Sequence, residues 1–237
     1  MSSGEFFEAR GIEAGYGSVK VLWGAGLKML DGETVVLLGA NGAGKTTFLK
    51  TLMGLLPAWN GRITFLGNDI GKLRTDRRVR AGLAYMSEMG CFAGLTVDEN
   101  IRIGGQFVPA PELRVRMAEM YETFPALGGR RGALAGTLSG GQRKMLGIAK
   151  ALAGNPRLIL MDEPSSGLSP LLVKEVIGVL ARFAGQGVSL LIAEQNVNFL
   201  KLAKRVYILN GGRIGFEGTV SELENNDALR REFFGLK

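Results

Sequence analysis

Short apolar runs separated by glycine, aspartate and asparagine dominate the first part of the chain. Runs of this length, bounded by turn residues, predict β-strands. They are FFEARGIEAGYG at residues 6–17, VLWGAGLKML at 21–30, ETVVLLG at 33–39 and GRITFLG at 61–67. Between the last two runs, residues 46–56 carry apolar side chains at helical spacing, which predicts a helix there.

From residue 97 onward the spacing of the apolar residues changes. Residues 97–153 are predicted to be mainly helical, because apolar positions recur about every 3.6 residues, as in PELRVRMAEMYETF. After them the predicted strands RLILM, VSLLIA and RVYIL alternate with predicted helices over 170–185 and 196–204. Apolar strands separated by helices predict a parallel sheet covered on both faces. We therefore expect an α/β fold with a mostly parallel sheet, an N-terminal antiparallel β portion and a helical insertion.

Composition narrows the class of protein. Of the 237 residues 46% are hydrophobic, yet no apolar run approaches the roughly 20 residues that cross a bilayer. The start MSSGEFFEARGIEAG lacks the apolar segment of a secretory signal. A single cysteine, Cys91, and no histidine argue against a disulfide framework and against a zinc site. We expect a cytoplasmic protein in which residues 1–237 form a single domain.

The net charge of +7 leaves the kind of partner open. Basic residues gather in GKLRTDRRVR at residues 71–80, at Arg130 and Arg131, and at Lys201, Lys204 and Arg205. Such clusters can attract nucleic acid, an anionic membrane surface or a nucleotide. Solvated helix faces explain each of them most simply, and none interleaves aromatic residues as a base-stacking surface does. We expect no nucleic-acid partner.

The segment VVLLGANGAGKTT carries the strongest motif. It fits G-x-x-x-x-G-K-[ST] directly after a predicted strand and at the start of a predicted helix, the context of a P-loop. Its glycines let backbone N–H groups turn toward a phosphate, and the helix N-terminus adds partial positive charge. Lys45 would reach the β- and γ-phosphates, the Thr46 hydroxyl would bind Mg²⁺, and Thr47 would hydrogen-bond the α-phosphate. The predicted nucleotide-binding residues here are Gly39, Ala40, Asn41, Gly42, Ala43, Gly44, Lys45, Thr46 and Thr47.

A P-loop alone does not separate a kinase from a GTPase or a transport motor, but two further segments do. RLILMDEP ends an apolar strand on Asp162 and Glu163, where one carboxylate suits Mg²⁺ binding and the other suits polarisation of a water. TLSGGQRKML places Ser139 and two glycines at the start of a predicted helix, which would form a second anion site. An ordinary serine N-cap is the alternative for that segment.

Together these segments resemble the ATP-binding subunits of ABC transporters over essentially the whole chain. Leu138, Ser139, Gly140, Gly141 and Gln142 match the signature of that family letter for letter. The resemblance implies a P-loop NTPase core of the ABC ATPase type, with a helical subdomain at about residues 89–153. It also implies that two ATP-binding subunits, two copies or two related chains, pair head to tail around ATP. Ser139 and Gly141 of one would then contact the γ-phosphate bound by Lys45 of the other.

The resemblance also assigns residues outside these motifs. The family stacks adenine on an aromatic residue some two dozen positions before the P-loop, where this chain has Tyr16; a packed turn tyrosine is the alternative. Glu88 stands where the family has a glutamine that senses Mg²⁺ and touches the membrane subunit, and a carboxylate still offers oxygen to the ion. Ser169 stands where the family usually has an aspartate, which puts communication between the two ATP sites in doubt.

A third departure lies in SLLIAEQN, residues 189–196. One strand after Asp162 the family places a switch histidine, and here that position is Gln195. Its amide can donate to a phosphate oxygen without titrating, although a polar helix cap is the alternative. We therefore predict a catalytic set of Glu163, Lys45 and Gln195, and Mg²⁺ ligands from Thr46, Asp162 and Glu88.

Four short tracts resemble one subgroup, the second ATP-binding subunit of importers for branched-chain amino acids, urea or amides. They are Glu88, EQN, GLSP at 167–170 and EFFGL at 232–236. The resemblance implies solute import driven by ATP hydrolysis at the cytoplasmic face of the inner membrane. It implies permease subunits in the membrane and a periplasmic solute-binding protein as partners. The alternatives are an exporter of lipid or polysaccharide, and an ABC ATPase of DNA repair or translation, whose second ATP domain or coiled-coil insertions are absent. The signature disfavours a plain P-loop kinase.

Overall fold

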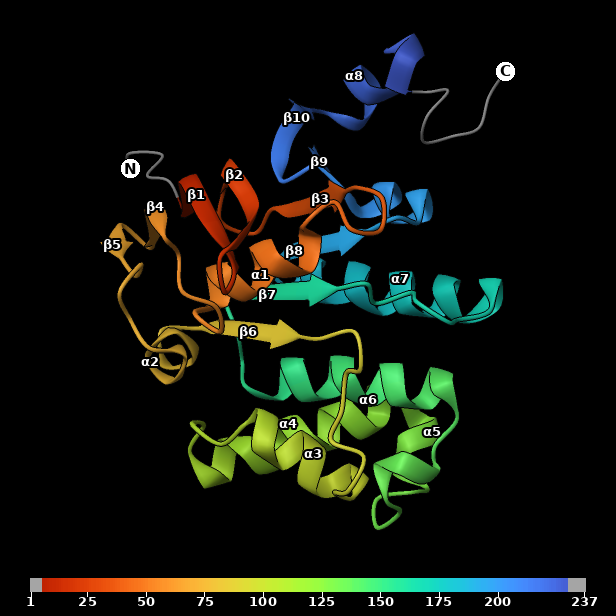
Figure 1. Ribbon diagram of the computed structural model, residues 1–237. Helices are drawn as coiled ribbons and strands as arrows, with labels where there is room; N and C mark the ends of the chain where they lie inside the picture. Colours follow the sequence, from red (N-terminus) through yellow and green to blue (C-terminus); the bar gives the residue numbers. More distant parts are fainter. Residues whose placement is uncertain (1–5, 230–237) are drawn as a thin grey trace.

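The computed structural model describes residues 6–229, which form two sheets and several helices (Figure 1). The smaller sheet is antiparallel, with the order β2-β1-β4-β5. Its strands are β1 (Phe7–Tyr16), β2 (Val19–Met29), β4 (Asn60–Phe65) and β5 (Asn68–Asp69). Strands β1 and β2 are joined by a two-residue turn that begins at Gly17, whose φ of 58° suits the tight turns of hairpins.

The larger sheet has the order β10-β9-β3-β8-β7-β6. Its strands are β3 (Thr34–Leu38), β6 (Leu83–Met86), β7 (Leu158–Asp162), β8 (Ser189–Glu194), β9 (Arg205–Asn210) and β10 (Arg213–Gly218). All its pairings are parallel except that of β10 with β9. Every residue of β3, β7 and β8 is buried, which explains why their sequences are continuous apolar runs without alternation.

Helices cover both faces of this sheet, and the group α3 to α6 lies below β6 in Figure 1, on the far side from the antiparallel sheet. The bounds are α1 (Lys45–Met53), α2 (Thr75–Arg80), α3 (Val97–Gly104), α4 (Ala110–Thr123), α5 (Pro125–Gly128), α6 (Gly140–Ala153), α7 (Pro170–Gly185) and α8 (Val220–Glu224). Two 3₁₀ helices, η1 (Ala135–Thr137) and η2 (Val197–Leu202), complete the connections.

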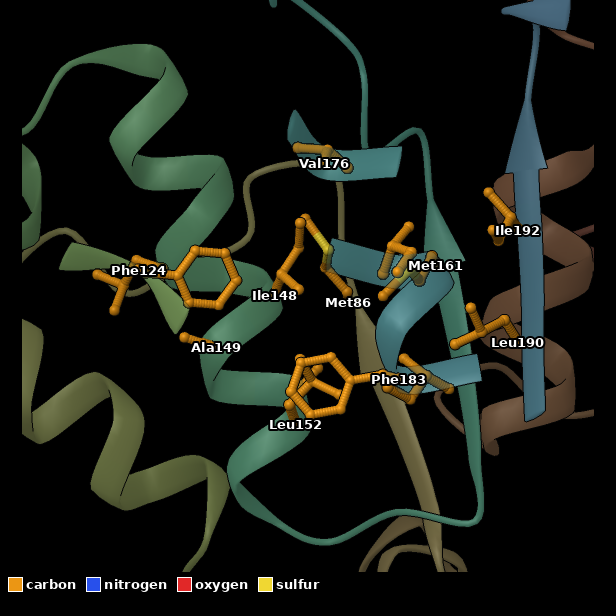
Figure 2. Close-up of a cluster of buried hydrophobic side chains, with 14 of the residues drawn as sticks. Met86, Phe124, Ile148, Ala149, Leu152, Met161, Val176, Phe183, Leu190 and Ile192 are labelled. Atoms are coloured by element: carbon orange, nitrogen blue, oxygen red, sulfur yellow. The ribbon is translucent and has the colours of Figure 1, made fainter. Parts of the chain in front are cut away.

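Successive strand residues enter two different cores, because side chains alternate across a strand. One core, shown in Figure 2, joins α6 and α7 to one face of the sheet through residues such as Met86, Ile148 and Ile192. The other lies against α1 and the antiparallel sheet, and includes Phe48 and Leu191. With both faces buried, the open edge at the carboxyl ends of β3, β7 and β8 is where polar side chains gather.

The α/β fold predicted from the sequence is confirmed, with its mostly parallel sheet, N-terminal antiparallel portion and helical segment. The predicted helix over residues 46–56 is α1, which ends at Met53 because Gly54 takes a left-handed φ of 76°. The helix predicted over 196–204 is confirmed as the 3₁₀ helix η2. EFFGL at 232–236 lies outside the described residues.

One basic residue contradicts the expectation of solvated helix faces. Arg78 of α2 is only 2% exposed. Its guanidinium donates hydrogen bonds to the carbonyl oxygens of Leu52 at 2.6 Å, Thr51 at 3.2 Å and Gly71 at 2.9 Å. Arg78 therefore caps the C-terminal end of α1, where carbonyl groups have no partner within the helix.

Candidate active site

The P-loop, residues 39–44, connects β3 to α1. Gly44, with a φ of 105°, is the N-cap of α1 and provides no side-chain cap, so the first N–H groups of this helix are open to an anion. A Cβ on Gly39 would lie 2.5 Å from the carbonyl oxygen of Leu209, which only glycine avoids. The Lys45 side chain is 4% exposed and folds back over the loop, where Nζ donates to the carbonyl oxygens of Gly39 at 2.8 Å and Ala40 at 3.1 Å.

The three residues predicted to be catalytic are in direct contact. The Lys45 ammonium and the Glu163 carboxylate form an ion pair of 3.1 Å. Gln195 Nε2 donates to Glu163 Oε1 at 3.3 Å and to Asn41 Oδ1 at 2.5 Å. The amide of Gln195 thus joins the end of β8 to both the P-loop and the residue that follows β7.

Thr46 and Asp162 form a second contact at the same edge. The Thr46 hydroxyl donates to Asp162 Oδ1 at 3.0 Å, and the Tyr85 hydroxyl donates to Asp162 Oδ2 at 3.1 Å. Asp162 is 2% exposed, and this burial raises the pKa of its carboxyl group against the opposing effect of the two hydrogen bonds. Adjacent hydroxyl and carboxylate oxygens are ligands that Mg²⁺ accepts, and a cation there would favour the ionised carboxylate.

Glu88 lies in the loop after β6, and its carboxylate accepts a hydrogen bond from the Ser166 hydroxyl at 3.1 Å. Its charge is close enough to raise the pKa of Asp162, but no hydrogen bond within residues 6–229 joins it to Thr46 or Asp162. In this same range no group of three or more histidine, cysteine, aspartate or glutamate side chains could hold a metal ion. Thr46 and Asp162 are thus the two predicted magnesium ligands in direct contact, and Glu88 as a third ligand stays a prediction.

Tyr16 ends β1 beside the P-loop helix. Its side chain is 47% exposed, and its hydroxyl accepts a hydrogen bond from the Thr47 hydroxyl at 3.5 Å. The ring is thus open to solvent next to a residue expected to bind the α-phosphate, an arrangement compatible with stacking on a base.

The signature residues form the first turn of α6 and the approach to it. Ser139 is the N-cap: its hydroxyl accepts from the Gln142 N–H at 3.3 Å, and Gln142 Oε1 accepts from the Ser139 N–H at 3.1 Å. This capping box matches the alternative considered for Ser139. Leu138 is buried, Gly140 is open to solvent, and a Cβ on Gly141 would lie 2.5 Å from the side chain of Leu172. No hydrogen bond or ion pair of the described residues joins this segment to the P-loop.

Four residues near the site have structural roles that the sequence motifs did not reveal. Ser169 is the N-cap of α7, and its hydroxyl accepts from the Leu172 N–H at 3.4 Å. Glu194 is 2% exposed and accepts from the N–H groups of Ser165, Gln195 and Asn196, so it holds the turn on which Gln195 is presented. The sequence offers no signal for the pairing of Tyr85 with Asp162.

The burial of Lys144 on α6 could have been predicted, because Lys144 falls on the inner helical face with Gly141 and Ile148.

Comparison with known proteins places this site in a family. The profile described as ABC transporter matches residues 22–166, more than half of the chain. The chain belongs to the ABC transporter family. It is therefore an ATP-binding, ATP-hydrolysing subunit of a transporter. Such subunits dimerise and work with permease subunits in the membrane.

Three relatives align over nearly the full length. The high-affinity branched-chain amino acid transport ATP-binding protein BraG of Pseudomonas aeruginosa is 38% identical over 222 residues, 93% of this chain and 95% of BraG. The probable branched-chain amino acid transport ATP-binding protein LivF of Archaeoglobus fulgidus is 31% identical, over 95% of this chain and 97% of LivF. The lipopolysaccharide export system ATP-binding protein LptB of Haemophilus influenzae is 34% identical, over 96% of each.

A solved structure agrees with the fold. The ADP conformation of MJ1267, an ATP-binding cassette of an ABC transporter, matches with a TM-score of 0.82 and 25% identity, covering 98% of this chain and all of that one. Among the helices of residues 6–229, none has the length and apolar character to cross a membrane.

Proposed function

We propose that this chain binds and hydrolyses ATP between two paired ATP-binding subunits and so powers the import of branched-chain amino acids. The chemistry rests on one observation, the contact of Glu163 with both Lys45 at 3.1 Å and Gln195 at 3.3 Å. The transported solute is inferred from the likeness to BraG and LivF, which are described as transport proteins for branched-chain amino acids.

The mechanism follows from this contact. Lys45, now paired with Glu163, would be attracted to the β- and γ-phosphates of ATP, because these carry more negative charge than one carboxylate. The carboxylate of Glu163 is then free to orient and polarise the attacking water. Gln195 would turn its amide from Glu163 to the γ-phosphate. Thr46 and Asp162 would hold Mg²⁺, which supplies positive charge against the phosphate oxygens when bound.

The remaining ligands would come from the partner subunit. Ser139 and the N–H groups at the start of α6 form a helix N-terminus that could bind an anion, and no hydrogen bond or ion pair within residues 6–229 joins them to the P-loop of their own chain. We infer that they contact the γ-phosphate held by the other subunit, while the exposed ring of Tyr16 stacks on adenine. Closure of the pair around ATP and reopening after hydrolysis would be the motion that drives transport.

The membrane partner would dock beside the helical segment of about residues 89–153, which we propose acts as a subdomain. A cavity of about 660 Å³ separates the loop after β6 from this segment, and its lining includes Glu88, Met89, Gly136 and Arg143. Permease segments that insert there would contact both the nucleotide side and the helical side of the chain. We place the subunit at the cytoplasmic face of the inner membrane, with a periplasmic solute-binding protein delivering the solute.

An exporter is the second candidate, because LptB, described as part of lipopolysaccharide export, is 34% identical to this chain. Affinity purification of the tagged chain from mild detergent, followed by mass spectrometry of its partners, discriminates the two. An importer should retain two permease subunits and be encoded with a solute-binding protein, and loss of the chain should abolish uptake of labelled leucine. Normal uptake of leucine, together with partners that bind lipid or polysaccharide, would favour export.

A further inference from the structure

Lys144 has an unusual place for a lysine. It lies on the second turn of α6, is 7% exposed, and forms no ion pair with a carboxylate of residues 6–229. Its ammonium instead donates to two backbone carbonyl oxygens, those of Glu88 at 2.6 Å and Glu163 at 2.8 Å. A buried ammonium needs such partners, because an unsatisfied one would lose its hydration without compensation.

The second of these carbonyl groups belongs to a strained residue. Glu163 has a φ of 47°, in the left-handed region that costs free energy for any residue with a Cβ. Its N–H donates to the carbonyl oxygen of Ala193 at 2.9 Å, so its peptide groups are held on both sides, by β8 and by Lys144. The direction in which the Glu163 carboxylate points depends on this backbone conformation.

The local charge explains why a cation is retained there. Burial lowers the pKa of Lys144, while the negative charges of Glu88, Glu194, Glu163 and Asp162 oppose that shift. The ammonium therefore joins three segments of the chain: α6, the loop after β6 and the turn after β7. A second link between the last two is the hydrogen bond from Ser166 to Glu88.

We propose that Lys144 is a positioning residue that couples the orientation of α6 and of the Glu88 loop to the catalytic carboxylate of Glu163. A movement of α6 relative to the sheet would pull on the Glu163 carbonyl group and so redirect the side chain that activates water. The inference rests on the role of Glu163 given under "Proposed function". It predicts a defect in the chemical step, with nucleotide binding left intact.

The test compares Lys144→Met with Lys150→Met in the full-length chain. Lys150 lies on the same helix, and its ammonium lies 4.5 Å from the ring centre of Phe92. No hydrogen bond within residues 6–229 joins it to the carbonyl groups of Glu88 or Glu163, so it controls for loss of a partly buried lysine from α6. We expect Lys144→Met to lower kcat for ATP hydrolysis at least about tenfold while KM stays within about twofold. Lys150→Met should keep both constants within about twofold of the wild type.

Three results would overturn the proposal: an unchanged kcat in folded Lys144→Met, equal losses in both variants, or a rise in KM that accounts for the whole defect. If Lys144→Met does not fold, Lys144→Gln decides, since its amide is uncharged and its side chain is shorter than that of lysine, so it cannot reproduce the two charge-assisted hydrogen bonds to these carbonyl groups. A loss of kcat at constant KM supports the proposal, and an unchanged kcat rejects it. Glu163→Gln, assayed beside them, separates the failures: if it hydrolyses ATP normally, the role of Glu163 is wrong, and the role of Lys144 falls with it.

Discussion

The P-loop and the signature are both built to bind phosphate, yet they differ in how complete they are within one chain. At the P-loop, Glu163 contacts both Lys45 and Gln195, and Thr46 contacts Asp162. At the signature, the Ser139 hydroxyl and the Gln142 side chain accept hydrogen bonds from each other's backbone N–H groups at the start of α6. One region brings the proposed catalytic residues together, and the other is a capped helix start that no hydrogen bond or ion pair within residues 6–229 joins to the P-loop.

The residues of the two regions therefore have different proposed roles. In the proposed function, residues at the P-loop act on the nucleotide bound by their own chain, so their substitution should affect each subunit separately. Residues of the signature would act on the nucleotide of the paired subunit, so their substitution should matter only when two subunits meet. Each prediction below tests one side of this comparison.

The largest effect is expected at Glu163. Replacing it with glutamine in Glu163→Gln removes the charge that polarises water but keeps the shape of the side chain. Hydrolysis should fall by about 100-fold or more, as is typical for loss of a general base, while ATP remains bound and the closed pair accumulates. Steady-state ATPase assays and size-exclusion chromatography with ATP measure both effects. Brisk hydrolysis by this variant would remove Glu163 from the catalytic centre.

The next effect is expected at the signature. Ser139→Ala should lower kcat by roughly 10- to 100-fold, the range for loss of one hydrogen bond to a charged group, with ATP affinity almost unchanged. It also removes a helix cap, which costs about 1 kcal/mol. Thr96→Ala is the matched control, because Thr96 and Glu99 form the same capping box on α3. Equal losses of activity in both variants would reduce Ser139 to a structural cap.

Gln195 should give a smaller effect. Gln195→Ala removes the amide that joins Glu163 to Asn41, and we expect kcat to fall about tenfold, in line with loss of one polar contact to a phosphate. Asn196→Ala, which removes the N-cap of η2, should leave kcat unchanged. If Gln195→Ala is as active as the wild type, the polar cap remains the explanation of EQN.

The same position offers a test by pH. The chain contains no histidine, so the wild type should hydrolyse ATP at a nearly constant rate from pH 6 to 8. Gln195→His should stay within about threefold of wild-type activity at pH 7.5 and acquire a titration near pH 6.5. A rate profile of Gln195→His that stays flat across this range would show that the side chain does not reach the phosphate.

The smallest effect is expected at Tyr85, which supports Asp162 without touching the nucleotide. Tyr85→Phe removes one hydrogen bond to a buried carboxylate, worth about 1 to 3 kcal/mol in stability, and should lower kcat only about threefold. Tyr121→Phe removes a similar bond, to Asp98 in the helical segment, at 2.9 Å. It should lower the unfolding temperature without affecting kcat. A lower kcat in Tyr121→Phe together with an unchanged kcat in Tyr85→Phe would contradict the assignment of the catalytic contacts to the P-loop side.

The sequence predicted the P-loop side well because its residues are close together along the chain or end apolar strands. A strand followed by glycines and lysine, and another followed by Asp162 and Glu163, leave few alternatives once the sheet is parallel. The resemblance placed Gln195 at the switch position, but its contact with Asn41 was not predicted, since it joins segments 154 positions apart.

Other features could not be predicted, because they depend on packing across distant elements. Arg78 reads as one of several surface cations, and only the position of α2 against the end of α1 buries it. The position of Lys144 on the inner face of α6 could be noticed from the sequence, but its partners could not be predicted, because they are backbone carbonyl groups. The type of the helix after EQN could not be predicted either: Asn196 accepts from the N–H of Asn198, and the segment forms a 3₁₀ helix.

The most direct test of the central claim is complementation between the two regions. Lys45→Met inactivates the P-loop of one subunit, Ser139→Ala the signature of another, and a mixed pair of the two keeps one intact site. Mixing equal amounts should raise ATP turnover well above the mean of the separate variants, toward about a quarter of the wild type, since about half of random pairs are mixed and each has one of two sites. Turnover that never exceeds that mean, although both variants dimerise normally with ATP, would contradict the shared site.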